Sequence, residues 1–123
     1  TMNGSPTVTG NGVTFYNAAG AVTFNGNSSS NLNAPSSGSY AGILVYQASG
    51  NSSTLTINGS ASAQMNGAIY VPSGRIVDNG SGSVGSYSIL VADTLTINGS
   101  AGLKDDYSSL PGGSPIKAAI LVE

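Results

Sequence analysis

The chain has 123 residues, enough for one domain, and a formal net charge of −2. Glycine, serine, asparagine and threonine make up 60 of the 123 residues, and because all four are middling or poor helix formers, the composition argues against a helical fold. The chain contains no cysteine and no histidine, which excludes thiolate and imidazole metal sites, Ser-His-Asp triads and cysteine nucleophiles.

Two kinds of short apolar run alternate along the chain. Runs of the first kind are apolar at almost every position and lie at 13–16, 43–46, 68–71 and 89–92. Runs of the second kind alternate apolar and polar residues, end in Asn-Gly, and lie at 21–26, 54–59, 75–80 and 94–99. A weaker third set lies around 31–33, 63–65, 83–85 and 102–104. This order predicts three strands in each repeat of about 20 to 30 residues.

The spacing of these runs predicts a parallel sheet. The heptapeptide Thr-Leu-Thr-Ile-Asn-Gly-Ser at 54–60 recurs letter for letter at 94–100. Stacking explains why the same Asn-Gly follows the same strand, with glycine at the corners and asparagine side chains bonding from coil to coil. The predicted fold is therefore all-β, a short right-handed parallel β-helix (β-solenoid) of about four to five coils. An antiparallel β-sandwich is the alternative, because Asn-Gly is also a strong hairpin signal.

The whole chain is predicted to be a single β-solenoid domain. Residues 1–12 are expected to be an N-terminal extension, 13–106 the coils, 107–115 a Ser/Pro/Gly loop and 116–123 a C-terminal strand.

The first kind of run predicts a sheet that is covered on both faces, because continuous apolar strands are typical of sheets buried on both sides. The residues expected on this covered apolar sheet are Tyr16, Leu44, Tyr46, Ile69, Tyr70 and Leu90. The chain's own ends or a neighbouring subunit would supply the cover. Alternatively, the tyrosines would form a surface on which carbohydrate stacks.

The second kind of run predicts an outward ladder of threonines. Its members are Thr23, Thr54, Thr56, Thr94 and Thr96. Flat threonine ladders can order water and bind ice, but the Asn-Gly alignment places Arg75 and Val77 in the middle of this one. Threonine is also simply a good strand former on a wet face, so ice binding is the weaker option.

No group of residues in the sequence is typical of an active site. Only Asp105 and Asp106 are close together among the acids, and neighbours in an extended strand point to opposite faces. We therefore expect no catalytic residue, no metal and no cofactor. With three Lys or Arg residues, the chain also lacks the basic surface that binds nucleic acid.

Four segments in order resemble the C-terminal region of TadG-like proteins of the bacterial tight-adherence (Flp) pilus system. They are Gly-Val-Thr-Phe-Tyr at 12–16, 33–44, Asn-Gly-Ala-Ile-Tyr-Val-Pro-Ser-Gly at 66–74 and Ile-Leu-Val-Ala-Asp-Thr at 89–94. The resemblance covers roughly residues 12 to 105 and implies an envelope or surface protein with a role in pilus assembly or attachment. Family members often carry cysteine just before the run that matches Ile89, whereas this chain has Ser-Tyr-Ser at 86–88.

The sequence thus predicts a non-enzymatic, extracellular or cell-surface bacterial structural protein, related to pilus assembly or polymerising through the ends of the solenoid. Terminal segments would add a strand to a neighbour, and their residues are Pro6, Thr7, Val8, Thr9, Ile116, Ile120, Leu121 and Val122. The expected partners are further copies of the chain or pilus and envelope components. An adhesin-like module that binds surface glycans is the alternative. We expect no membrane span within this chain, and any signal or anchor would lie upstream of it.

Overall fold

A computed structural model describes residues 1, 8–26, 30–59, 64–80, 83–84, 88–100, 102–103 and 107. This part of the chain is all-β, with ten strands and no helix. The strands are β1 (Val8–Asn11), β2 (Phe15–Asn17), β3 (Val22–Gly26), β4 (Ser30–Asn33), β5 (Ile43–Gln47), β6 (Leu55–Gly59), β7 (Gln64–Asp78), β8 (Ser83–Val84), β9 (Ser88–Ile97) and β10 (Gly102–Leu103). No helix of the described residues is long and apolar enough to cross a membrane.

The strands pair in parallel. Eight of them form one sheet, in which β1 pairs with β4, β2 with β5 and β3 with β6, and all three of these later strands pair with β7. On its other edge β7 pairs with β9, and β8 pairs separately with β10. Every strand pair of the described residues is parallel, which contradicts the antiparallel β-sandwich.

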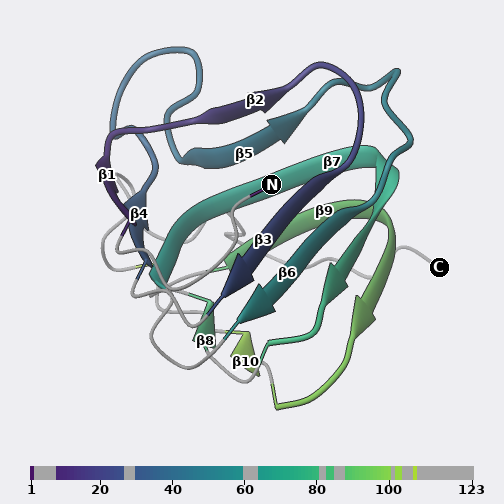
Figure 1. Ribbon diagram of the computed structural model, residues 1–123. Coiled ribbons are helices and arrows are strands. Elements are labelled where there is room, and N and C mark those ends of the chain that lie inside the picture. The colour runs from purple at the N-terminus through teal and green to yellow at the C-terminus, as the bar shows by residue number, and fades with distance from the viewer. Residues whose placement is uncertain are drawn as a thin grey trace, which may run out of the picture.

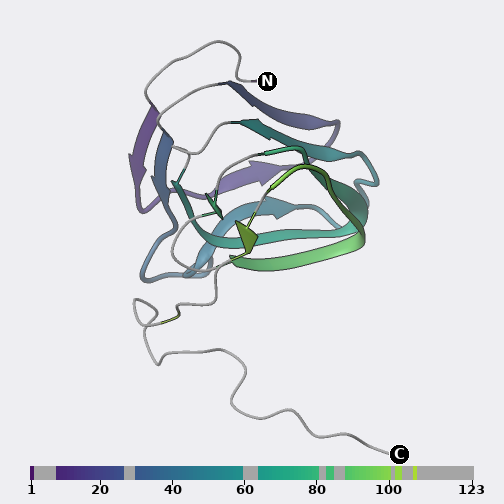
Figure 2. The ribbon, with the colours of Figure 1, turned by 90° about the horizontal axis from the view of Figure 1, so that it is seen from below.

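The large sheet is strongly curled. Strand β7 is 15 residues long and bends around the molecule, so that it takes part in all three series of pairings (Figure 1). Viewed from below, the strands curve around a common interior (Figure 2). The residues on the concave face of the sheet can therefore meet in one core.

The core is made of rows of side chains, all apolar except Asp78, that follow the strand register from one strand to the next. One row, named here the Leu95 row, runs Val22, Leu55, Ile76, Leu95. A second, the Ile97 row, runs Phe24, Ile57, Asp78, Ile97. A third, the Leu90 row, runs Phe15, Val45, Ile69, Leu90. Removing such side chains from water is the main contribution to the stability of the sheet.

The repeated heptapeptide marks strands that are two steps apart. Leu55 and Leu95 occupy the same row but lie on either side of Ile76 of β7. The offset of 40 residues therefore covers two passes of the chain. The connection between β4 and β5, at 34–42, has nine residues and adds most of the extra length by which β3 and β6 lie further apart in sequence than β6 and the second half of β7.

Segment 1–12, predicted as an extension, contains β1, which pairs with β4 from Val8 to Asn11. Of the predicted loop at 107–115 only Tyr107 is described, and the predicted C-terminal strand at 116–123 lies outside the described residues.

Glycine at position 74 is required by close packing. A Cβ atom there would lie 2.6 Å from the Ser53 carbonyl oxygen and 2.7 Å from Gln47 Nε2. We expect Gly74→Ala to lower the free energy of unfolding by about 2 kcal/mol, as overpacking in a well-packed interior does. The matched control is Gly50→Ala, since a Cβ at Gly50 would meet nothing within 4 Å. Urea unfolding of the two variants checks the prediction, and equal stability would contradict it.

Candidate functional site

A ladder of asparagine amides runs across the ends of the paired strands β3, β6, β7 and β9. Its members, named here the Asn25 ladder, are Asn25, Asn58, Asn79 and Asn98. Each later amide donates from Nδ2 to the Oδ1 of the earlier one, at 2.6 Å from Asn58 to Asn25, 2.6 Å from Asn79 to Asn58 and 2.8 Å from Asn98 to Asn79. The asparagine bonds predicted from the Asn-Gly repeats are thus confirmed between neighbouring strands. The ladder also has a direction, because all donors point toward the N-terminal strand.

The asparagines of β1, β4 and β7 follow the same rule. Asn66 donates to Asn33 at 2.6 Å, and Asn33 donates to Asn11 at 3.0 Å. On the β2–β5 pair the direction is reversed, because Asn17 Nδ2 of the earlier strand donates to Gln47 Oε1 at 2.8 Å.

The C-terminal edge of the sheet leaves core residues open to solvent. Leu95 is 45% exposed and Ile97 is 40% exposed, although Leu55 and Ile76 in the Leu95 row are both 0% exposed. The difference arises because Leu55 and Ile76 have a strand on each side, whereas in the described part of the chain β9 pairs only with β7. Among the described residues, the outer edge of β9 thus combines backbone groups that have no strand partner with exposed apolar side chains, which makes it a template for another strand.

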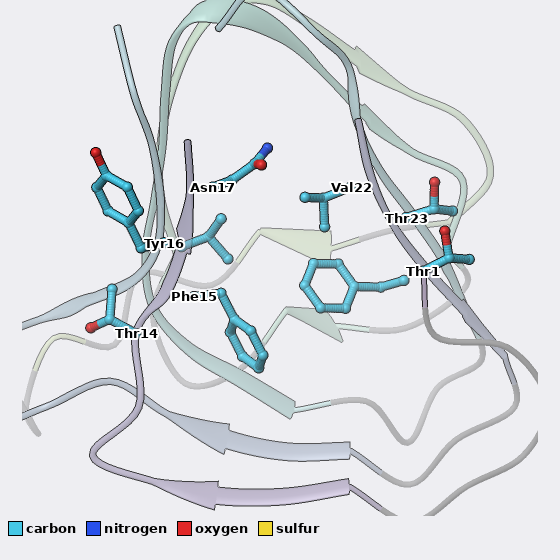
Figure 3. A pocket seen from close by; sticks show the side chains of 9 residues that line it. Thr1, Thr14, Phe15, Tyr16, Asn17, Val22 and Thr23 are labelled. Atoms are coloured by element: carbon cyan, nitrogen blue, oxygen red, sulfur yellow. The ribbon is translucent and has the colours of Figure 1, made fainter. Parts of the chain in front are cut away.

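The opposite edge of the sheet, formed by β2 and β3 and named here the N-terminal edge, holds a pocket of about 370 Å³. Phe15 and Tyr16 of β2 and Val22 of β3 line it (Figure 3). Phe24 of β3 lines it as well. Val45 of the next strand also lines it, as do Thr1, Thr14, Asn17 and Thr23. The rings of Phe15 and Phe24 meet edge to face, with centroids 5.8 Å apart. This pocket is apolar and lies where the core rows begin.

Three tyrosines of the paired strands β2, β5 and β7 form a stack on the outer face of the sheet. Tyr16 and Tyr46 stack with centroids 5.6 Å apart, and Tyr46 and Tyr70 at 5.3 Å. Tyr40, from the 34–42 connection, packs edge-on against Tyr46 at 5.6 Å. Tyr16 remains 57% exposed. Most of the stacked ring faces therefore contact another tyrosine and not solvent.

The predicted apolar sheet divides between two faces. Leu44 and Ile69 are fully buried in the core and Leu90 packs against it, whereas the three stacked tyrosines lie on the outer face.

The threonine face carries a cation. Thr23 is paired with Thr56, and Val77 of β7 stands between Thr56 and Thr96. Arg75 is aligned with Thr94 and donates from its guanidinium to Thr96 Oγ1 at 2.7 Å. Thr54 precedes β6, and its carbonyl accepts from the Val22 amide at 3.3 Å.

The two described carboxylates are in different surroundings. Asp78 is 3% exposed and accepts a hydrogen bond from the Gly80 amide at 2.8 Å, whereas Asp93 is exposed. Among the described residues, no three His, Cys, Asp or Glu side chains gather closely enough to hold a metal ion.

Of the predicted assembly residues, the structure describes two. Val8 and Thr9 lie on β1 and pair in register with β4, while Pro6, Thr7, Ile116, Ile120, Leu121 and Val122 lie outside the described residues.

No protein-family model, no curated protein and no solved structure matches this chain. The resemblance to TadG-like proteins therefore stays a prediction from the sequence.

Proposed function

We propose that this chain is a non-enzymatic structural protein of the bacterial cell surface that assembles through the ends of its sheet. The curled parallel sheet is, in this proposal, a right-handed parallel β-helix of four to five coils. The resemblance to TadG-like proteins supports a place in the envelope, with pilus components or further copies of the chain as partners.

The observation that carries the proposal is the exposure at β9. Leu95 and Ile97 are 45% and 40% exposed although the register places them in core rows. A folded protein rarely leaves such side chains beside an unpaired strand edge without protecting the edge by charge, proline or a covering element. Repeat folds of this kind need capping at their ends, and a second copy can supply the cap.

The chemistry of the described side chains supports a structural role. The chain has no histidine and no cysteine, and Asp78 is buried in the Ile97 row, where it accepts a hydrogen bond from the backbone of Gly80. A general acid or base needs an accessible proton-transfer partner, whereas Asp78 here fixes the turn after β7.

The exposed tyrosines support an adhesin-like, glycan-binding function as the second candidate. Stacking on a sugar requires an open ring face, and the stack of Tyr16, Tyr46 and Tyr70 occupies most of these faces. Tyr16, at the end of the stack, is 57% exposed, whereas Tyr46 and Tyr70 are half-buried. Saturable binding of a glycan by a strict monomer would favour this candidate. Ice binding has less support, because Arg75 and Val77 interrupt the threonine face.

We expect the purified chain to form fibres of uniform width above a threshold concentration. Light scattering over a concentration series gives the threshold, and negative-stain electron microscopy gives the width. A chain that stays monomeric at every concentration would contradict the proposed assembly. The predicted terminal segments would be located by deleting residues 1–9 or 116–123 from chains that do assemble.

A further inference from the structure

The geometry points to a head-to-tail joint in which β3 of one copy lies in parallel beside β9 of the preceding copy and continues its rows in register. This inference rests on the proposed function, because it names the partner as a second copy and the joint as these two edges. Such a contact is heterologous and does not close on itself, so it would produce a filament.

The core rows of two stacked copies match end to end. Each core row begins at the N-terminal edge and ends at the C-terminal edge, so a stacked copy would place its Val22 over Leu95 and its Phe24 over Ile97. In the same register its Phe15 would lie over Leu90. The exposed side chains of β9 would then enter the surroundings that Leu55 has within one chain, where it is 0% exposed.

The outward rows of two stacked copies match as well. The row Thr23, Thr56, Val77, Thr96 begins and ends with threonine. The tyrosine row begins at Tyr16 and ends at Val91, which is 39% exposed. The end positions of these rows carry no charge at either edge, so their junction buries none.

The pocket at the N-terminal edge has the properties of a receptor for this contact. It has a volume of about 370 Å³ and is lined by Val22, Phe24 and Phe15. These are the first residues of the three core rows. Leu95, Ile97 and Leu90 of the preceding copy would therefore face the residues that line it.

The Asn25 ladder has a direction that a head-to-tail joint would keep. Asn98 donates to Asn79, and no described residue donates in turn to Asn98 Oδ1. In register with β9, Asn25 of the next copy would lie beside Asn98, as Asn98 lies beside Asn79 within one chain. The row of asparagines would then continue from one copy to the next in the same order.

The opposite orientations do not satisfy the ladder. Two C-terminal edges facing each other would set the two Asn98 carbonyl oxygens together, and two N-terminal edges facing each other would leave the exposed Leu95 and Ile97 of both copies outside the contact. Either arrangement would also make the strands antiparallel, and the residue rows would lose their register.

Cysteine pairs test the joint, because the chain has no cysteine of its own. Within one chain Thr23 and Thr96 are three strand spacings apart, roughly 14 Å, which is too far for a disulfide. Across the proposed joint they are one spacing apart, about 4.8 Å, which is within range. The full chain carrying Thr23→Cys and Thr96→Cys is therefore expected to form covalent ladders of dimers, trimers and longer species on oxidation, seen on non-reducing gels.

Three controls accompany this variant. Thr23→Cys alone and Thr96→Cys alone are each expected to give less than a tenth of the covalent dimer, because a head-to-tail joint never brings like edges together. The pair Thr23→Cys and Thr56→Cys, which are neighbours in one chain, should close within the chain and shows that this spacing permits a disulfide.

The outcomes separate the joint from the proposed function. Covalent ladders in the double variant with monomers in both single variants would support the joint. Dimers of a single variant would overturn its polarity. Fibres without covalent ladders would overturn the joint and leave the assembly function standing, whereas a chain that neither scatters nor crosslinks would overturn both.

Discussion

Replacing Gln47 by leucine is expected to lower the free energy of unfolding by about 3 to 5 kcal/mol, because leucine leaves several buried polar groups without partners. Gln47 is 0% exposed. Its Nε2 donates to the carbonyl oxygens of Asn51 and Ser53, each at 2.9 Å, and its Oε1 accepts from Asn17 at 2.8 Å. Leucine has a similar volume and restores none of these bonds.

The surroundings of Gln47 make this cost hard to recover. The two carbonyls belong to the turn that follows β5, and Asn51 also bonds the Gly20 carbonyl at 3.1 Å across the neighbouring pass of the chain. Gln47 therefore fixes the turn between β5 and β6 and ties it to Asn17 at the end of β2. Since small domains are stable by about 5 to 15 kcal/mol, the loss is a large part of the total.

Urea unfolding followed by circular dichroism measures the effect. Ser49→Leu is the matched control, because Ser49 lies in the same turn and is exposed. It is expected to change the free energy of unfolding by less than about 0.5 kcal/mol, as is usual for surface positions. If Gln47→Leu unfolds at the same urea concentration as Ser49→Leu, the corner does not depend on the Gln47 bonds.

The sequence predicted the parallel pairing because the same residue types recur at the same place in each repeat. Asn25, Asn58, Asn79 and Asn98 are each followed by glycine. Stacked strands in register bring such residues side by side, where amides bond. The alternation around Leu55 and Leu95 likewise identified their inward faces, because side chains of a strand alternate between the two sides of a sheet.

The sequence could not predict the role of Gln47 or of Asp78. Asp78 occupies a core row whose other members are Phe24, Ile57 and Ile97, and an apolar residue would be expected there from the pattern. Its burial depends on the turn at Gly80, because the Gly80 amide donates a hydrogen bond to the Asp78 carboxylate. Gln47 likewise depends on partners that its hydrophobic pattern does not reveal, because they are the Asn17 amide of another strand and two backbone carbonyls of the following turn.

The hydrophobic pattern also could not show which side chains of β2, β5 and the first half of β7 face the core and which face outward. Runs such as Ile43 to Tyr46 are apolar throughout, so alternation gives no signal. The bulge between Ile43 and Val45 adds to this, because it buries Leu44 and Val45 together. The outward position of the tyrosine stack therefore becomes visible only in the structure.

Replacing Leu95 by glutamate is expected to raise the concentration needed for assembly by at least 100-fold, while the single copy stays folded. In the proposed joint the side chain at 95 lies against Val22 of the next copy, so a carboxylate there would be removed from water without a partner. A cost of about 3 kcal/mol corresponds to roughly a hundredfold in an association constant.

Thr94→Glu is the matched control, because it introduces the same charge one residue earlier on an exposed, outward-facing position. It is expected to raise the threshold less than about threefold, since surface charges are screened by solvent and salt. Light scattering gives the threshold for both variants, and the yield of Thr23→Cys to Thr96→Cys crosslinks should fall in parallel with Leu95→Glu.

The stability of the Leu95→Glu chain decides between cover by a second copy and cover by the chain itself. Leu95 is 45% exposed in the single copy, so the substitution should cost only about 1 kcal/mol of unfolding free energy, less than the full burial of a leucine. If residues outside the described part of the chain cover β9 instead, the same glutamate would be buried within the monomer. The free energy of unfolding would then fall by several kcal/mol, as for a charge introduced into a core. An assembly threshold unchanged by Leu95→Glu would exclude β9 from the joint by an independent route, because it requires no statement about stability.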